Sequence, residues 1–155
     1  MTTDYELEAL ARAIIDDNLY MTLGTADEDG RPWASPVYYA VEDYREFIWV
    51  SRPGSRHSRN IAVRPQLGIA IFDSRVPIDT GHGVYMSALA EELTGPEADR
   101  AIETFSSRSQ MHGGDPWTLA DVREPAEFRL YRAIASDHSV IRPGILRTPV
   151  DLTSR

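Results

Sequence analysis

The chain contains no cysteine and no lysine, so all 16 of its basic residues are arginine. Without cysteine it cannot form disulfides, thiolate metal ligands or a cysteine nucleophile. Without lysine it cannot form a Schiff base through a lysine amine. Arginine instead supplies planar, bidentate hydrogen bonding to phosphate and carboxylate groups. The basic side chains of this protein are therefore suited to binding anions.

Long apolar runs are also missing, because none approaches the ~20 residues that span a bilayer. The N-terminal stretch MTTDYELEAL lacks the cationic and apolar pattern of a secretion signal. The formal net charge is −8, whereas nucleic acids and membrane surfaces attract proteins with a basic face. We therefore expect a soluble, cytoplasmic protein that binds neither nucleic acid nor membranes.

The length and composition fit a single folded domain over residues 1–155. Hydrophobic residues make up 42% of the chain and charged residues 26%, which is ordinary for a globular protein and argues against disorder. No internal repeat or low-complexity segment divides the chain. The tail from about residue 143 is expected to be loosely held.

Hydrophobic periodicity predicts three helices and a series of strands. Apolar residues recur at helical spacing over Asp4–Asp17 and after Gly95-Pro96, and a shorter helix is expected over Ser55–Val63. Residues 106–117 are expected to form a loop. Strands joined by turns such as Asp29-Gly30 favour an antiparallel sheet or barrel, mainly β within the α+β class. The strand patterns cover Tyr20–Ala26, Pro32–Val41, Phe47–Ser51, Leu67–Phe72, Val84–Leu93, Glu127–Ala135 and His138–Ile141.

Acidic residues are absent from residues 47–72, although the whole chain has 24 of them. This segment includes SRPGSRHSRN, residues 51–60, between a predicted strand and a predicted helix. A helix N-terminus carries unpaired N–H groups and a partial positive charge, so with Arg56, His57 and the serine hydroxyls it suits a phosphate group. The same residues fit a simpler interpretation, in which Ser55 caps the helix and the arginines form a solvated face.

Three segments carry a resemblance to a known family: GTADEDGRPWASPVYYA, FIWVSRPGSRHSRNIAVRPQLGIAIF and HGVYMSALAEEL. Their motifs are Gly30-Arg31-Pro32 with Ser35-Pro36-Val37, then Val50-Ser51, Ser55-Arg56-His57, and Asn60 with Arg64-Pro65. In their order these motifs resemble the pyridoxamine 5′-phosphate oxidase-like, FMN-binding split-barrel family. The resemblance covers Leu19–Leu93 well and the remainder of the chain loosely.

This resemblance implies a six-stranded antiparallel split β-barrel with flanking helices, which forms a homodimer with FMN in a groove at the subunit interface. It implies an FMN-dependent oxidoreductase that acts on a small molecule by hydride transfer at the flavin; no catalytic side chain is identified. The cofactor-binding residues that it implies are Ser51, Ser55, Arg56 and His57 for the phosphate, and the backbone of Ser35, Pro36 and Val37 for the flavin ring.

Two departures from the family pattern change these expectations. His57 stands where the family often has lysine, so the charge at this position depends on pH. The C-terminal arginine-leucine-histidine segment that holds the substrate phosphate in true pyridoxamine phosphate oxidases is absent. Oxidation of pyridoxamine phosphate itself is therefore not expected.

Two alternatives to an FMN enzyme remain open. The cofactor could be a deazaflavin, for which Arg52, Arg59 and Arg75 are the local partners for the extra carboxylates of its tail. The chain could instead hold flavin or haem without turnover, and haem would require an axial histidine.

Other chemically active residues have simpler explanations. Three histidines and two aspartates show no metal-binding spacing, so no metal site is predicted; they are His82, His112, His138, Asp79 and Asp115. Five aromatic residues are candidates for stacking on a bound ring, but most of them are expected in the barrel core or the dimer interface: Trp33, Tyr38, Tyr39, Trp49 and Tyr85. Trp117 is expected to anchor its loop or to cover a pocket.

Overall fold

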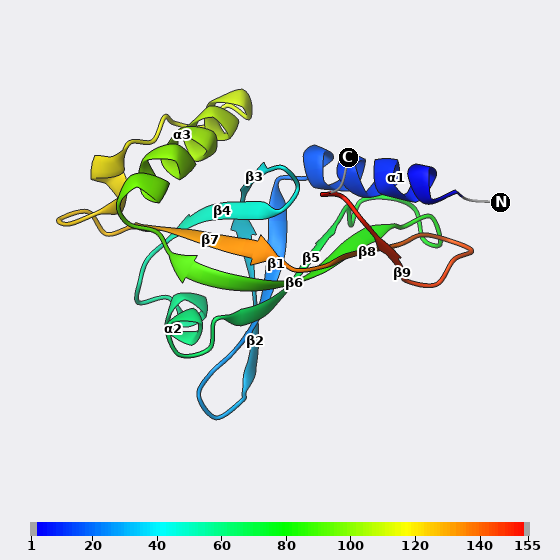
Figure 1. Ribbon diagram of the computed structural model, residues 1–155, viewed down its shortest axis with the longest axis horizontal. Helices are drawn as coiled ribbons and strands as arrows, with labels where there is room; N and C mark the ends of the chain where they lie inside the picture. The colour runs from blue at the N-terminus through cyan, green and yellow to red at the C-terminus, as the bar shows by residue number, and fades with distance from the viewer. Residues whose placement is uncertain (1–2, 154–155) are drawn as a thin grey trace.

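The computed structural model describes residues 3–153, which form one curled antiparallel sheet with helices around it (Figure 1). The helices are α1 (Asp4–Asp17), α2 (Arg56–Val63) and α3 (Pro96–Met111), followed by a short 3-10 helix, η1 (Leu119–Val122). The strands are β1 (Tyr20–Ala26), β2 (Pro32–Tyr38), β3 (Ala40–Glu42), β4 (Glu46–Ser51), β5 (Gln66–Phe72), β6 (Gly83–Glu92), β7 (Arg129–Ala135), β8 (His138–Ile141) and β9 (Thr148–Val150).

The strand order is β2-β1-β5-β6-β7-β4-β3, and β8 adds to it by pairing with β6 and β9. β5 lies between β1 and β6 and is therefore a central strand of the sheet. Six strands have at least six residues, whereas β3, β8 and β9 have three or four. The predicted mainly β split barrel is confirmed, with three short strands added at its margins.

The barrel interior is filled by large side chains that alternate along the strands. Trp49 of β4 is fully buried and stacks on Tyr131 of β7, with ring centroids 5.7 Å apart. Tyr39 is also fully buried, and its hydroxyl donates a hydrogen bond to the carbonyl of Ile15 in α1. Both side chains therefore belong to the core, as predicted, and Tyr39 joins α1 to the sheet.

The predicted strand Pro32–Val41 is divided into β2 and β3 in the structure. The division falls at Tyr39, whose N–H donates to the carbonyl of Leu19, just before β1. β2 pairs with β1 over its whole length, whereas β3 pairs with β4. The chain therefore changes partner strands at Tyr39, which a single alternating pattern does not reveal.

Two segments are more ordered than the sequence predicts. α3 continues to Met111, inside the segment expected to be a loop, because Phe105 and Ser109 extend the buried face of the helix. After residue 143, where a loose tail is expected, the chain forms β9 and buries Leu152.

An ion-pair cluster attaches α3 to the sheet. Arg132 of β7 has a side chain that is only 10% exposed. Its guanidinium contacts three carboxylates: Glu46 at 3.0 Å, Glu91 at 2.7 Å and Glu97 at 2.9 Å. Glu97 lies in the first turn of α3, and Arg100 of the same helix contacts Glu46 at 3.4 Å. The cluster therefore fixes α3 against β4, β6 and β7.

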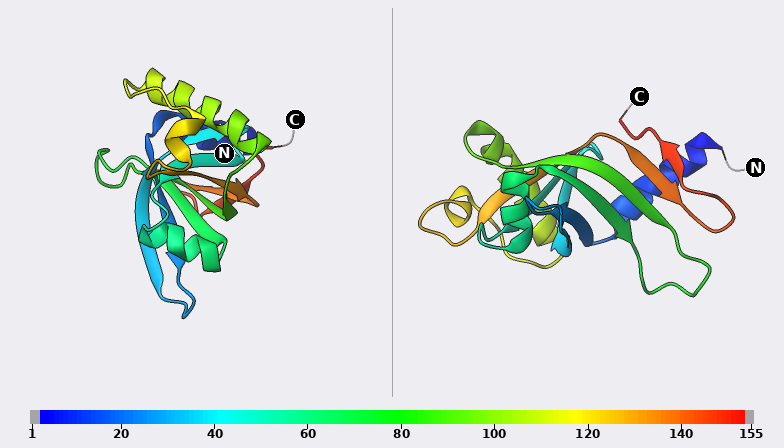
Figure 2. Two further views of the ribbon diagram at one scale, coloured as in Figure 1. Left: turned by 90° about the vertical axis from the view of Figure 1, so that its left-hand side faces the viewer. Right: turned by 90° about the horizontal axis from the view of Figure 1, so that it is seen from below.

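The helices occupy two ends of the molecule (Figures 1 and 2). α1 lies beside β8 and β9, whereas α2 and α3 lie at the other end, on opposite sides of β4 and β7. None of the helices within residues 3–153 is long and apolar enough to cross a membrane.

Candidate functional site

The segment 51–60 forms the end of β4, a turn and the first residues of α2. Ser55 is the N-cap of α2, and its hydroxyl oxygen accepts from the N–H of Ser58 at 3.4 Å. Asn60 is buried and donates its side-chain N–H to Thr25 Oγ1 of β1 at 3.0 Å. These contacts hold the N-terminus of α2, with its unpaired N–H groups, beside the end of β4.

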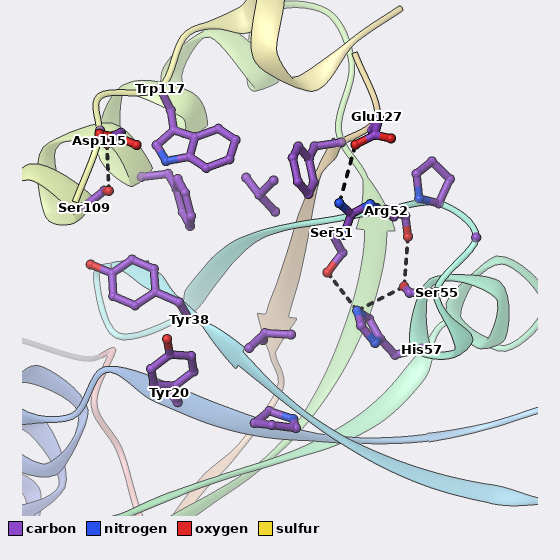
Figure 3. Close-up of a pocket in the computed structure, with 17 residues that line it drawn as sticks. Tyr20, Tyr38, Ser51, Arg52, Ser55, His57, Ser109, Asp115, Trp117 and Glu127 are labelled. Atoms are coloured by element: carbon purple, nitrogen blue, oxygen red, sulfur yellow. Dashed lines mark hydrogen bonds and ion pairs between the residues drawn. The ribbon is translucent and has the colours of Figure 1, made fainter. Parts of the chain in front are cut away.

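A groove of about 930 Å³ opens between the start of α2 and the side of α3 (Figure 3). We call the end of the groove beside α2 the hydroxyl end; it is lined by Ser51, Arg52, Pro53, Gly54, Ser55 and His57. Its aromatic end consists of Tyr20, Tyr38, Phe105, Trp117 and Phe128. Pro36, Val37 and Val50 form the wall between the two ends, and Ser109, Asp115 and Glu127 complete the lining.

His57 joins the hydroxyl groups of this end into one cluster. Its Nε2 lies 2.8 Å from Ser51 Oγ and 3.3 Å from Ser55 Oγ. Burial lowers the pKa of His57, so the imidazole is neutral at neutral pH in the free protein. The cluster therefore offers hydroxyl and imidazole groups beside a helix N-terminus, which is a donor set suited to a phosphate group.

The structure gathers five of the seven sequence-predicted cofactor residues around this groove. Pro36, Val37, Ser51, Ser55 and His57 all line it.

Ser35 and Arg56 lie elsewhere. Ser35 is buried within β2, next to the groove residue Pro36. Arg56 is exposed at the start of α2, and its guanidinium carbon lies 4.2 Å from the ring centroid of Trp33. Arg56 is thus beside the hydroxyl end but does not face into it.

The sequence did not reveal the wall of the groove that α3 and its following loop provide. The loop is held by two serines of α3: Ser106 Oγ accepts from the N–H of Trp117 at 2.9 Å, and Ser109 Oγ donates to the carbonyl of Asp115 at 2.8 Å. The only sequence signal was Trp117, which was expected to anchor its loop or cover a pocket. It does both, because its N–H is held by Ser106 of α3 and the residue lines the groove.

The charges of the groove are largely paired. Arg52 contacts Glu127 at 3.4 Å, and its guanidinium carbon lies 4.8 Å from the ring centroid of Phe128. The carboxylate of Asp115 adds a negative charge to the lining. An anion is therefore attracted to the hydroxyl end by the N-terminus of α2.

The three histidines outside the groove have separate surroundings. His112 Nδ1 lies 2.7 Å from the hydroxyl of Tyr38, and His138 Nε2 lies 2.5 Å from the carbonyl of Tyr44. His82 lines a different cavity. Within residues 3–153, no three histidine or carboxylate side chains are placed to hold a metal ion.

Comparison with known proteins places the chain in a family. The sequence model described as pyridoxamine 5′-phosphate oxidase matches residues 7–137. The pyridoxine/pyridoxamine 5′-phosphate oxidase of Burkholderia lata is 32% identical over 122 residues, which are 77% of this chain and 55% of that protein. The chain thus spans about half the length of this relative.

Solved structures share the fold at lower sequence identity. A haem-binding protein from Mycobacterium smegmatis superposes with a TM-score of 0.74 and 20% identity, covering 98% of this chain and 59% of that one. An F420 reductase gives a TM-score of 0.62 and 16% identity, covering 83% of this chain and 95% of that one. The match over residues 7–137 and the split-barrel fold agree: this chain belongs to the pyridoxamine 5′-phosphate oxidase family.

Proposed function

We propose that this protein binds FMN in the groove between α2 and α3 and acts as an oxidoreductase on a small molecule. The observation that carries the proposal is the convergence of Ser51, Ser55 and His57 at the N-terminus of α2, in a groove that also has an apolar wall. When bound, a flavin supplies hydride transfer, and the protein supplies position and electrostatics. No side-chain nucleophile is then required.

Each part of the groove has a role in this proposal. The hydroxyls of Ser51 and Ser55 and the first-turn N–H groups of α2 bind the phosphate. The backbone of Pro36 and Val37, which are neighbours on β2, provides the surface along which the ring lies, and Val50 adds an apolar contact beside it. The curvature of the sheet brings β2 and β4 to the same groove, so the phosphate and the ring are bound by different strands.

The charge of the groove supports FMN over a deazaflavin. A deazaflavin tail carries additional carboxylates, whereas the arginine of the lining, Arg52, is already paired with Glu127. Arg59 is exposed one turn further along α2, and Arg75 is paired with Asp73 at 3.2 Å. The donors of the hydroxyl end therefore match FMN, which has one phosphate, better than a deazaflavin, whose tail adds several carboxylates.

Haem binding is the alternative from another class, because one structural neighbour is a haem-binding protein. The histidine in the groove lining is His57, and its Nε2 is hydrogen-bonded to Ser51. Axial ligation through this atom would require that hydrogen bond to break. The groove therefore supports flavin better than haem, and a visible spectrum of the purified protein distinguishes the two.

We expect FMN to bind about ten- to a hundredfold more tightly than riboflavin, because a charge-assisted phosphate contact contributes about 1.5–3 kcal/mol. The cation–π contact of Arg56 with Trp33 is worth less, about 0.5–1 kcal/mol at an exposed site, so a bound phosphate draws Arg56 toward it. Arg56→Gln is then expected to weaken FMN binding and leave riboflavin binding unchanged. Titration of flavin fluorescence measures both affinities.

Arg59→Gln is the matched control, because Arg59 lies on the same helix but a turn further from the hydroxyl end. It is expected to change neither affinity. Equal binding of FMN and riboflavin by the parent protein would contradict the proposal. Equal losses in the two variants would indicate a diffuse basic face instead of a phosphate site.

We also propose a homodimer, because an apolar face of the sheet is exposed on β1, β2, β5 and β6. Leu89 of β6 is 56% exposed and Trp33 of β2 is 41% exposed, and both line one shallow groove with small residues between them. Light scattering is expected to give about twice the chain mass of 17.4 kDa. Leu89→Glu is expected to shift the protein toward monomer; a monomeric parent at micromolar concentration would contradict the dimer.

A further inference from the structure

The aromatic end of the groove is a continuous row of rings. The rings meet edge to face in four successive pairs, from Tyr20 on β1 to Phe128 before β7. The centroid distances are 6.0 Å for Tyr20 and Tyr38, 5.7 Å for Tyr38 and Phe105, 5.6 Å for Phe105 and Trp117, and 5.8 Å for Trp117 and Phe128. Edge-to-face packing holds each ring at a fixed angle, so the row forms a rigid apolar wall.

The polar groups of this wall are the hydroxyls of Tyr20 and Tyr38 and the indole N–H of Trp117, and the Tyr38 hydroxyl is held in place by a neighbour. The hydroxyl of Tyr38 lies 2.7 Å from Nδ1 of His112, at the C-terminal end of α3 (Figure 3 shows Tyr38 in the groove). Burial raises the pKa of Tyr38, and burial together with Arg108 lowers the pKa of His112. Both groups are therefore uncharged at neutral pH, and the hydroxyl offers one hydrogen bond to a ligand.

The charged side chains that line the groove offer no unpaired cation to an anionic ligand. Arg108 keeps its positive charge behind this wall, but it is not among the lining residues, and its guanidinium donates to the carbonyls of Asp16 and Asn18 at 3.2 and 2.9 Å. Arg52 is committed to Glu127, as described above. The carboxylate of Asp115 remains as a negative charge in the lining. A carboxylate or phosphate entering here would leave water without a direct contact to an unpaired cation of the lining.

We propose that the aromatic end binds a second molecule, the substrate: a planar ring system without negative charge that carries one hydrogen-bonding oxygen for Tyr38. The proposal rests on the proposed function, in which the phosphate of FMN occupies the hydroxyl end. The groove volume of about 930 Å³ is at the upper end for small-molecule sites, which span roughly 300–1,000 Å³, so it has room for both molecules. The substrate class differs in charge from a phosphorylated pyridoxine.

The test uses two isosteric probes, naphthamide and naphthoate, with the full chain saturated with FMN. Equilibrium dialysis measures the affinity for each probe. Naphthamide is expected to bind roughly tenfold more tightly, because naphthoate brings an unpaired charge into the groove. Asp115→Asn, which removes one charge and keeps the backbone carbonyl that Ser109 contacts, is expected to reduce this preference by about two- to fivefold.

Trp117→Leu is expected to weaken the binding of both probes by roughly tenfold, because an inner ring of the row, in contact with Phe105 and Phe128, is lost. Tyr5→Leu is the control, since Tyr5 is an exposed aromatic residue of α1. It is expected to change neither affinity. Circular dichroism of each variant verifies that the fold is retained.

Several outcomes decide the proposal. Equal affinity for the two probes, no binding of either, or displacement of FMN by naphthamide would overturn it, while FMN binding itself would still stand. Selective binding of naphthamide by a protein that binds no FMN would support the ring site and overturn the proposed function. The two failures are therefore distinguishable in one set of measurements.

Discussion

Arg132→Met is expected to lower the free energy of unfolding by about 3 kcal/mol, because removing one partner of a buried ion pair leaves uncompensated charge. The Arg132 side chain is 10% exposed and contacts three carboxylates, from Glu46, Glu91 and Glu97. In the variant Glu91 and Glu97 lose their cation, and the largely buried Glu46 keeps only the exposed Arg100, at 3.4 Å. Urea denaturation followed by circular dichroism measures the change.

Arg100→Met provides the matched control for this prediction. Arg100 contacts Glu42 at 3.2 Å and Glu46 at 3.4 Å, but its side chain is 67% exposed. Water screens such pairs, so the expected loss is below about 1 kcal/mol. If the two variants were destabilised equally, burial of Arg132 would not be the cause, and the cluster would act as an ordinary surface network.

The second large effect is expected at His57: the affinity for FMN should depend on pH through the charge of its imidazole. Burial holds the pKa of His57 below its usual range in the free protein. A bound phosphate favours the imidazolium, so the pKa is higher in the complex. Affinity is then greatest below the pKa of the free protein, falls as pH rises between the two values, and is constant above the pKa of the complex.

Two substitutions at His57 separate the effect of the imidazole charge from the effect of the phosphate, which also changes its charge with pH. His57→Lys keeps a positive charge near neutrality and is expected to flatten the pH dependence. His57→Gln is expected to weaken binding about ten- to a hundredfold at low pH and little at alkaline pH, since only the charged imidazole makes the strong contact.

The phosphate itself gains its second charge near pH 6, which raises affinity with pH and opposes the effect of His57. The comparison is therefore made between variants at the same pH, by quenching of flavin fluorescence from about pH 5.5 to 8.5, a range that spans the ordinary histidine pKa. Identical profiles for the parent and both variants would exclude His57 from the phosphate site.

Features with a local cause were predictable from the sequence. The β1–β2 hairpin is set by Gly30, whose φ of 83° suits glycine, and its N–H donates to the carbonyl of Asp27. α1 begins at Thr3, whose side chain forms a capping box with Glu6. The N-cap role of Ser55 also follows from neighbouring residues, so α2 and the hydroxyl end could be located before the structure was known.

Features that join distant segments were decided by the tertiary structure. The aromatic end brings Tyr38 of β2 against Phe105 of α3, and Arg132 of β7 binds Glu46 of β4. The spacing of these residues in the sequence does not indicate either contact, because both contacts depend on how the sheet curls and where α3 packs on it. The direction of Arg56 was also settled only in three dimensions, where the ring of Trp33 lies within reach. Local hydrogen bonds and periodicity specify elements, whereas the two walls of a groove meet only when those elements pack.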